Sequence, residues 1–257
     1  MPVDLYCNVI APFCRAVMLL AKALDIELNL IDVDVLKREQ YKPEFLALNP
    51  QHCIPTLVDG DVVVWESNAI LIYLAEKYGT DEKQFYPKDI AERAKVNRLL
   101  FFQLGALHRN VSTYYFPILM GGEGKPEDFR KVQDTVCILD KFLEGNRWVA
   151  GDQLTVADFS IVINVAALEN VVKFDLSHYR NVCRWYQLCK QEFQGFQDMT
   201  LEATNKSKEC FEAIKKYKKD EYLMAQETPC CSGKGSAASS EEPCSEKEKD
   251  KPEDPDT

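Results

Sequence analysis

The chain has 257 residues, of which 46% are hydrophobic and 11% aromatic, so it can bury the core of a globular protein. Its formal net charge of −10 argues against nucleic acid or an anionic membrane as a partner. No apolar run approaches the roughly 20 residues of a membrane span, and the first residues lack the basic region of a signal peptide. We therefore expect a cytoplasmic protein.

The first 80 residues alternate between strand and helix patterns. Val3–Tyr6 is a short apolar strand, and apolar residues recur at helical spacing from Pro12 to Leu24. Residues 27–33 alternate with period two, and a short helix is expected to end before Asn49-Pro50. A hairpin around Asp59-Gly60 and a helix over Ser67–Tyr78 follow. This order, β-α-β-α-β-β-α, is typical of a thioredoxin-like domain, which we place at residues 1–80.

An Ile-Pro bond opens the first strand of the hairpin, although proline cannot donate a hydrogen bond to a sheet ladder. We expect a cis bond between Ile54 and Pro55 that turns the backbone of Cys53 and Ile54 outward. Glu66 and Ser67 then stand directly before an apolar helix, whose free N–H groups and positive dipole end attract carboxylates. An extended backbone edge beside such a helix start is typical of a receptor for a short peptide.

The rest of the folded chain shows helical patterns only. We place an all-helical domain at residues 88–222, with a long helix over Arg93–Tyr115 that stops near Pro117. Thr155 and Asp158 have the spacing of a capping box at the start of a later helix. After residue 225 the composition turns to Ser, Glu, Lys, Pro, Gly and Cys without aromatic residues, so we expect a disordered tail over 225–257.

Ten cysteines are scattered along the chain, and none forms a Cys-x-x-Cys pair. This spacing argues against a zinc site, and we expect no metal. Without a secretory signal, a disulfide framework is not expected either. Most cysteines of the folded body are expected to be small buried hydrophobic residues.

Five fragments occur in order along the chain: Pro43-Glu-Phe-Leu, Asn49-Pro-Gln-His-Cys-Ile-Pro-Thr-Leu-Val, Trp65-Glu-Ser, Leu143-Glu-Gly and Leu154-Thr-Val-Ala-Asp. Together they resemble the soluble glutathione transferases, and most closely the insect delta/epsilon group, over residues 3–220. The resemblance implies an α/β thioredoxin-like N-terminal domain followed by an all-α C-terminal helical bundle. It also implies glutathione as a co-substrate and a homodimer.

Within this resemblance the peptide groove is a glutathione site. Ile54 would pair its backbone with the cysteinyl residue, and Glu66 and Ser67 would hold the γ-glutamyl amine and carboxylate. His52, with Gln51, would face the glycine carboxylate. The residues expected to bind glutathione are Gln40, Gln51, His52, Cys53, Ile54, Glu66, Ser67 and Asn68. Gln40 and Asn68 replace the histidine and arginine that are usual in the group, so a lower affinity for the anionic tripeptide is expected.

The serine that stabilises the thiolate in this group is missing. Counting back four residues from Arg15 leads to Ala11, and Ala11-Pro-Phe-Cys14 resembles the Cys-Pro-Phe/Tyr-Cys of glutaredoxins and the Cys-Pro-Phe of omega-type transferases, with alanine at the reactive position. A hydrogen bond to a charged group is worth roughly 1.5–3 kcal/mol, so its loss predicts weak activity or rescue by another group. The candidates are Tyr6, Asn8 and Cys14.

The long helix is expected to hold the second substrate. Five of its side chains share one face, at i, i+3, i+4, i+7 and i+8: His108, Val111, Ser112, Tyr115 and Phe116. This spacing alone is typical of a core, but the resemblance also favours a pocket for an apolar electrophile or a steroid-like ligand.

The leading hypothesis is a transferase that conjugates glutathione to apolar electrophiles in detoxification. The alternatives are a non-catalytic member that binds apolar ligands or serves structurally, as lens crystallins do, and a thiol-disulfide protein that uses Cys14.

Overall fold

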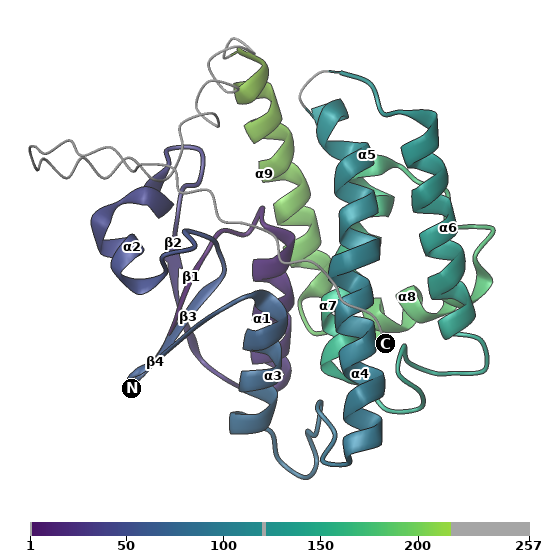
Figure 1. Cartoon of the computed structure of the whole chain (residues 1–257), viewed down its shortest axis with the longest axis horizontal. Coiled ribbons are helices and arrows are strands. Elements are labelled where there is room, and N and C mark those ends of the chain that lie inside the picture. Colours follow the sequence, from purple (N-terminus) through teal and green to yellow (C-terminus); the bar gives the residue numbers. More distant parts are fainter. Residues whose placement is uncertain (1, 120–121, 217–257) are drawn as a thin grey trace, which may run out of the picture. The chain divides into compact units, whose positions relative to one another are not determined.

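The computed structural model describes residues 2–119 and 122–216, all of which belong to one compact unit (Figure 1). The tail predicted over 225–257 lies outside these ranges. Because the sheet and the helices share this unit, the predicted domain boundary between residues 80 and 88 stays a prediction. Among the helices in the described ranges, none is long and apolar enough to cross a lipid bilayer.

A mixed sheet of four strands lies at the N-terminal side of the unit, in the order β2-β1-β3-β4. Strand β1 pairs in parallel with β2 and antiparallel with β3, and β3 forms an antiparallel hairpin with β4. The strands are β1 (Val3–Cys7), β2 (Leu28–Asp32), β3 (Thr56–Asp59) and β4 (Val62–Trp65). The predicted strand and hairpin order is therefore confirmed.

The two faces of β1 carry different layers. Val3, Leu5 and Cys7 alternate along the strand and are buried in the main core. Tyr6 points to the opposite face, where its ring contacts Phe45 of α2 with centroids 5.8 Å apart.

The helical elements of this half are α1 (Pro12–Ala23), η1 (Glu39–Tyr41), α2 (Pro43–Leu48) and α3 (Ser67–Tyr78). Helix α1 packs against both α3 and α7, and so joins the sheet to the helical part.

Helix α7 lies at the centre of the helical part, because all its residues from Val156 to Ala166 are buried. Figure 1 shows α4 and α5 following each other in one column beside α6. The elements are α4 (Ile90–Phe102), η2 (Gln103–His108), α5 (Arg109–Leu119), α6 (Pro126–Phe142), α7 (Val156–Ala167), η3 (Leu168–Val172), α8 (Arg180–Glu192) and α9 (Phe196–Lys216).

The long helix predicted over Arg93–Tyr115 differs in two ways. A π-helical segment, η2, interrupts it, and α5 continues through Pro117 to Leu119. Proline removes one N–H donor, but its fixed φ suits a helix, so the last turn continues past it. A π-helical turn widens the backbone locally and is frequent at functional sites. The polar and apolar spacing of a sequence does not reveal it.

Candidate functional site

The segment before β3 presents a short stretch of backbone. The Ile54-Pro55 bond is cis, as expected. The carbonyl oxygen of Cys53 accepts hydrogen bonds from Asn49 Nδ2 (3.1 Å) and Thr56 Oγ1 (2.9 Å). By contrast, the amide and carbonyl of Ile54 have no hydrogen-bond partner among the described residues. An extended ligand could therefore add its own backbone to this edge.

The start of α3 lies beside this edge. Glu66 precedes the helix with a φ of 67°, a conformation that is uncommon for residues other than glycine and that recurs at functional sites. Gln51 Nε2 donates to Glu66 Oε1 (3.0 Å), and Trp65 Nε1 donates to Gln51 Oε1 (2.9 Å). These two hydrogen bonds hold the Glu66 carboxylate at the N-terminus of the helix. Ser67, the first helical residue, is buried.

These groups line a cavity of about 240 Å³. Six of the residues predicted to bind glutathione contribute to its walls: Gln51, Cys53, Ile54, Glu66, Ser67 and Asn68. Phe13 of α1 and Leu104 of η2 also line it, and neither was predicted from the sequence. Apolar residues on helices carry no local mark of such a role, because their placement depends on how α1 and η2 pack.

Asn68 lines the cavity, but its side chain is committed to other contacts. Its Nδ2 group donates to the carbonyl of Leu100 (3.2 Å) and to Gln103 Oε1 (3.2 Å). Its Oδ1 atom accepts from Ser160 Oγ (2.6 Å). The amide thus joins α3 to α4, η2 and α7. Its side chain is therefore engaged within the protein, while its backbone N–H lies at the helix start. The expected part of Asn68 in glutathione binding stays a prediction.

Gln40 and His52 lie outside the walls of this cavity. Gln40 Nε2 donates to the carbonyl of Val35 (3.4 Å). The His52 ring packs on the Tyr41 ring with centroids 4.6 Å apart. The expected contact of His52 with the glycine carboxylate and the expected part of Gln40 in glutathione binding stay predictions.

A second cavity, of about 550 Å³, is lined mainly by apolar atoms. All five side chains predicted on the face of the long helix contribute to it: His108, Val111, Ser112, Tyr115 and Phe116. Ala11 and Asn8 line it from the loop before α1, and residues of α7 and α9 form further parts of the walls. The contribution of α9 was not predicted, because a helix far along the sequence reaches this cavity only through the tertiary fold.

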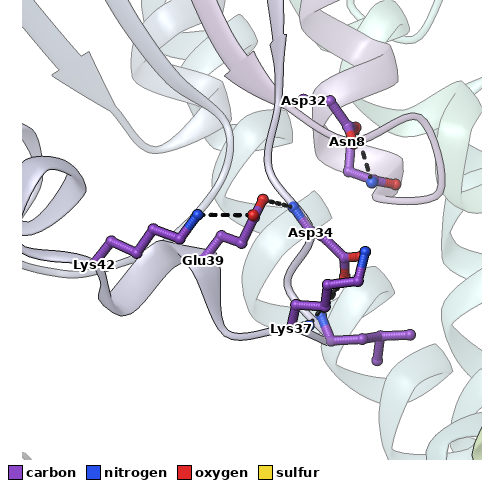
Figure 2. Close-up of polar contacts among 7 residues, drawn as sticks. Asn8, Asp32, Asp34, Lys37, Glu39 and Lys42 are labelled. Atoms are coloured by element: carbon purple, nitrogen blue, oxygen red, sulfur yellow. Dashed lines mark hydrogen bonds and ion pairs between the residues drawn. The ribbon is translucent and has the colours of Figure 1, made fainter.

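The loop after β2 supplies a further part of the wall, through Asp34, Val35 and Leu36. Figure 2 shows the polar contacts that hold it. Glu39 Oε2 accepts from the backbone N–H of Asp34 (2.9 Å), while Glu39 Oε1 accepts from Lys42 Nζ (2.8 Å). Asp34 Oδ1 in turn accepts from the N–H of Leu36 (3.0 Å). These hydrogen bonds fix the conformation of the loop whose residues line the cavity.

Ala11 is the N-cap residue of α1, and its side chain provides no cap. Of the candidate donors, Asn8 lines the same cavity, but its Nδ2 group already donates to Asp32 Oδ1 (3.1 Å), as Figure 2 shows. Tyr6 lines neither this cavity nor the smaller one, because it packs on α2 at the other face of the sheet. Tyr6 therefore does not reach the cavity that Ala11 lines. Asn8 does reach it, but its Nδ2 group already donates a hydrogen bond to Asp32.

Cys14 is fully buried, and burial raises the pKa of its thiol to about 12. A protonated, inaccessible thiol neither attacks nor exchanges with a disulfide. The thiol-disulfide hypothesis is therefore not supported.

We expect Cys14→Ala to leave conjugation and thiol-transfer rates within about twofold of wild type, measured with purified protein. A large loss of thiol transfer would contradict this assignment.

Two further polar residues of the larger cavity were missed. Arg15 Nη1 donates to the carbonyls of Val9 (2.7 Å) and Ile10 (2.9 Å), which holds the loop before α1. Arg15 Nε and Thr200 Oγ1 are buried and have no partner among the described residues. Burial lowers the pKa of Arg15 to about 10, so the guanidinium stays charged at neutral pH.

The chain matches two family models: "Glutathione S-transferase, N-terminal domain" over residues 1–76 and "Glutathione S-transferase, C-terminal domain" over residues 107–192. It is 42% identical to glutathione S-transferase D6 of Drosophila melanogaster over 196 residues, which cover 76% of this chain and 90% of that protein. For glutathione S-transferase D7 of the same species the identity is 41%, and the coverages are 85% and 97%.

Solved structures agree. A delta-class glutathione transferase of Nilaparvata lugens superposes with a TM-score of 0.77 at 39% identity, covering 83% of this chain and all of that one. A Bombyx mori glutathione transferase superposes with a TM-score of 0.77 at 34% identity, covering 80% of this chain and 96% of that one. The chain therefore belongs to the glutathione S-transferase family, within its insect delta/epsilon group.

Proposed function

We propose that this protein conjugates the thiol of glutathione to apolar electrophiles. The observation that carries the proposal is the Ile54 backbone without a partner beside the start of α3, in a cavity that also contains Glu66 and Ser67. A tripeptide fits this arrangement because the edge offers backbone hydrogen bonds while the helix start attracts a carboxylate. The family to which the chain belongs supports the choice of glutathione.

In the proposed complex the cysteinyl backbone of glutathione pairs with Ile54. The γ-glutamyl carboxylate accepts hydrogen bonds from Ser67 and the first N–H groups of α3, and its amine faces the Glu66 carboxylate. Ala11 lies two residues before Phe13, which lines the smaller cavity, and Ala11 itself lines the larger one. The thiol would therefore point from the smaller cavity toward the larger one.

The larger cavity favours an apolar second substrate, because Val111, Phe116 and the other apolar side chains on the same helix face form one wall. The binding of an apolar ligand without turnover is the alternative function. It is favoured by Ala11, which cannot stabilise a thiolate.

One experiment separates the two functions. Purified protein is titrated with glutathione in a calorimeter and then assayed with a chlorinated nitrobenzene. Binding followed by turnover supports the transferase. Binding without turnover supports the non-catalytic alternative, and absence of glutathione binding contradicts the proposed site.

Glu66→Gln should weaken glutathione binding about fivefold, because an exposed ion pair with the γ-glutamyl amine is worth up to about 1 kcal/mol. The loss should shrink at high salt, since salt screens exposed charges. Calorimetric titration measures both effects. Glu82→Gln is the matched control, because it removes one negative charge at another exposed position, outside the cavity. Equal affinity of the two variants would contradict the proposed role of Glu66.

A further inference from the structure

The proposed conjugation requires a group that takes the proton of the glutathione thiol, and the alanine at position 11 cannot do so. We propose that His108 accepts this proton through Nε2 and that Asn164 positions the His108 ring. This inference rests on the proposed function and extends it.

His108 lines the larger cavity and contacts a residue that lines the smaller one. Its ring contacts the Phe13 ring with centroids 4.5 Å apart and planes at 61°. Phe13 lines the smaller cavity together with Ile54, whereas His108 lines the larger one together with Ala11. A thiol held through Ile54 and directed past Phe13 would therefore reach the imidazole. The histidine is also the last residue of the π-helical segment η2.

Asn164 determines which ring nitrogen carries the proton. Its Nδ2 group donates to the carbonyl of Ser160 (3.1 Å), so its Oδ1 atom is the one that faces His108. That oxygen lies 3.3 Å from His108 Nδ1. Because an amide oxygen only accepts, Nδ1 carries the hydrogen, and the neutral ring keeps its lone pair on Nε2. The free lone pair is what a proton acceptor needs.

Burial favours the neutral form of the His108 ring before substrate binds. The other titratable side chains of the larger cavity are Arg15, Asp34, Tyr115 and Cys210. Arg15 donates hydrogen bonds to the carbonyls of Val9 and Ile10, and the Asp34 carboxylate is paired with Lys37 at 3.0 Å. Burial raises the pKa of Tyr115 to about 12 and also raises the pKa of Cys210, so both stay protonated. Burial likewise lowers the pKa of His108, while its contact with Asn164 opposes this shift.

The proposed reaction begins with a proton transfer from the glutathione thiol to His108. The S–H proton passes to Nε2, and sulfur keeps the bonding electron pair, which leaves a thiolate beside an imidazolium. The thiolate then forms a bond to the electrophilic carbon, and a halide leaves with the electron pair of its bond to that carbon. The imidazolium finally releases its proton to water. His108 would thus replace a hydrogen-bond donor by a proton acceptor, a role that general bases fill in many enzymes.

The test compares His108→Gln with His178→Gln, which changes an exposed histidine (84% accessible) that lines neither cavity. The thiolate absorbance of bound glutathione is followed against pH, and kcat/KM is measured with a chlorinated nitrobenzene. We expect His108→Gln to bind glutathione, to raise the apparent pKa of the bound thiol, and to lower kcat/KM about 10²-fold at neutral pH. His178→Gln should match wild type.

The variant Asn164→Asp distinguishes a positioning role of Asn164 from a purely structural one, because only the positioning role predicts a shift in the pH profile of kcat/KM. A carboxylate beside Nδ1 favours the imidazolium, so the pKa of His108 should rise, and the pH profile of kcat/KM should shift upward with it. Histidine nitrogen chemical shifts in wild type test the tautomer without any variant. Glutathione should convert His108 to the imidazolium, whereas S-methylglutathione, which has no thiol proton, should leave it neutral.

Normal glutathione binding with an unchanged thiol pKa in His108→Gln would overturn this inference and leave the proposed function intact. A neutral His108 in the wild-type glutathione complex at a pH where the bound thiol is ionised would overturn it equally. Failure of wild type to bind glutathione would overturn the proposed function, and this inference with it.

Discussion

Ala11→Ser should increase the rate of glutathione conjugation by about tenfold to a hundredfold at neutral pH. Ala11 has φ −69° and ψ 118° at the N-cap of α1, a conformation that serine also favours. Because the residue lines the larger cavity, an added hydroxyl can donate to the thiolate. A hydrogen bond to a charged group is worth roughly 1.5–3 kcal/mol, and this range corresponds to the expected gain.

The measurement is kcat/KM over a range of pH, together with the pKa of the bound thiol, which should fall. Ala167→Ser is the matched control, because it adds the same hydroxyl to the same cavity from α7. If His108 already takes the thiol proton, the gain from Ala11→Ser should be larger in the His108→Gln background than in wild type. An Ala11→Ser protein without any gain in either background would refute the expectation that position 11 faces the sulfur.

Asp158→Asn should lower the free energy of unfolding by about 3–5 kcal/mol. Asp158 is completely buried at the start of α7, and both carboxylate oxygens accept hydrogen bonds. Oδ1 accepts from the N–H of Val149 (2.9 Å) and from Trp185 Nε1 (2.9 Å), and Oδ2 accepts from the N–H (2.9 Å) and Oγ1 (3.2 Å) of Thr155. The asparagine amide nitrogen cannot accept, so one pair of donors would lose its partner.

Urea unfolding, followed by tryptophan fluorescence and circular dichroism, measures this loss. Asp152→Asn makes the same chemical change at an exposed position of the preceding loop and should change stability by less than about 0.5 kcal/mol. A loss below about 1 kcal/mol for Asp158→Asn would show that the buried carboxylate does not anchor α7. The expected loss of about 3–5 kcal/mol would also affect the candidate site, since Asn164 and Ser160 lie on the same helix as Asp158.

Local signals predicted much of the first half of the chain. Helix α3 spans Ser67–Tyr78, as predicted. Gly79, which follows this helix, is required for a steric reason. Its φ is −64°, and a Cβ at this position would collide with the carbonyl oxygen of Ala75. The spacing of Thr155 and Asp158 correctly predicted the capping box of α7.

The candidate site was predicted less completely, and the reason lies in long-range contacts. Asn68 was expected to bind glutathione because it occupies the position of the arginine that is usual in the group, but Ser160, which lies 92 residues later, engages its side chain. Asn164 carried a weak signal, as a polar residue within the apolar run Phe159–Ala167, because buried polar groups need partners. Nothing in the sequence identified His108 as the hydrogen-bond partner of Asn164.

Sequence patterns alone predicted most of the elements and the two parts of the candidate site that are local in the chain. These are the prolyl edge at Ile54 with the helix start at Ser67, and the shared helix face that contains His108 and Tyr115. Only the tertiary structure brought His108 to Phe13 and Asn164 and placed Ala11 in the same cavity. Helical and strand periodicities arise from neighbouring residues, whereas a cavity is enclosed by side chains from α1, η2, α7 and α9 that meet only when the core packs.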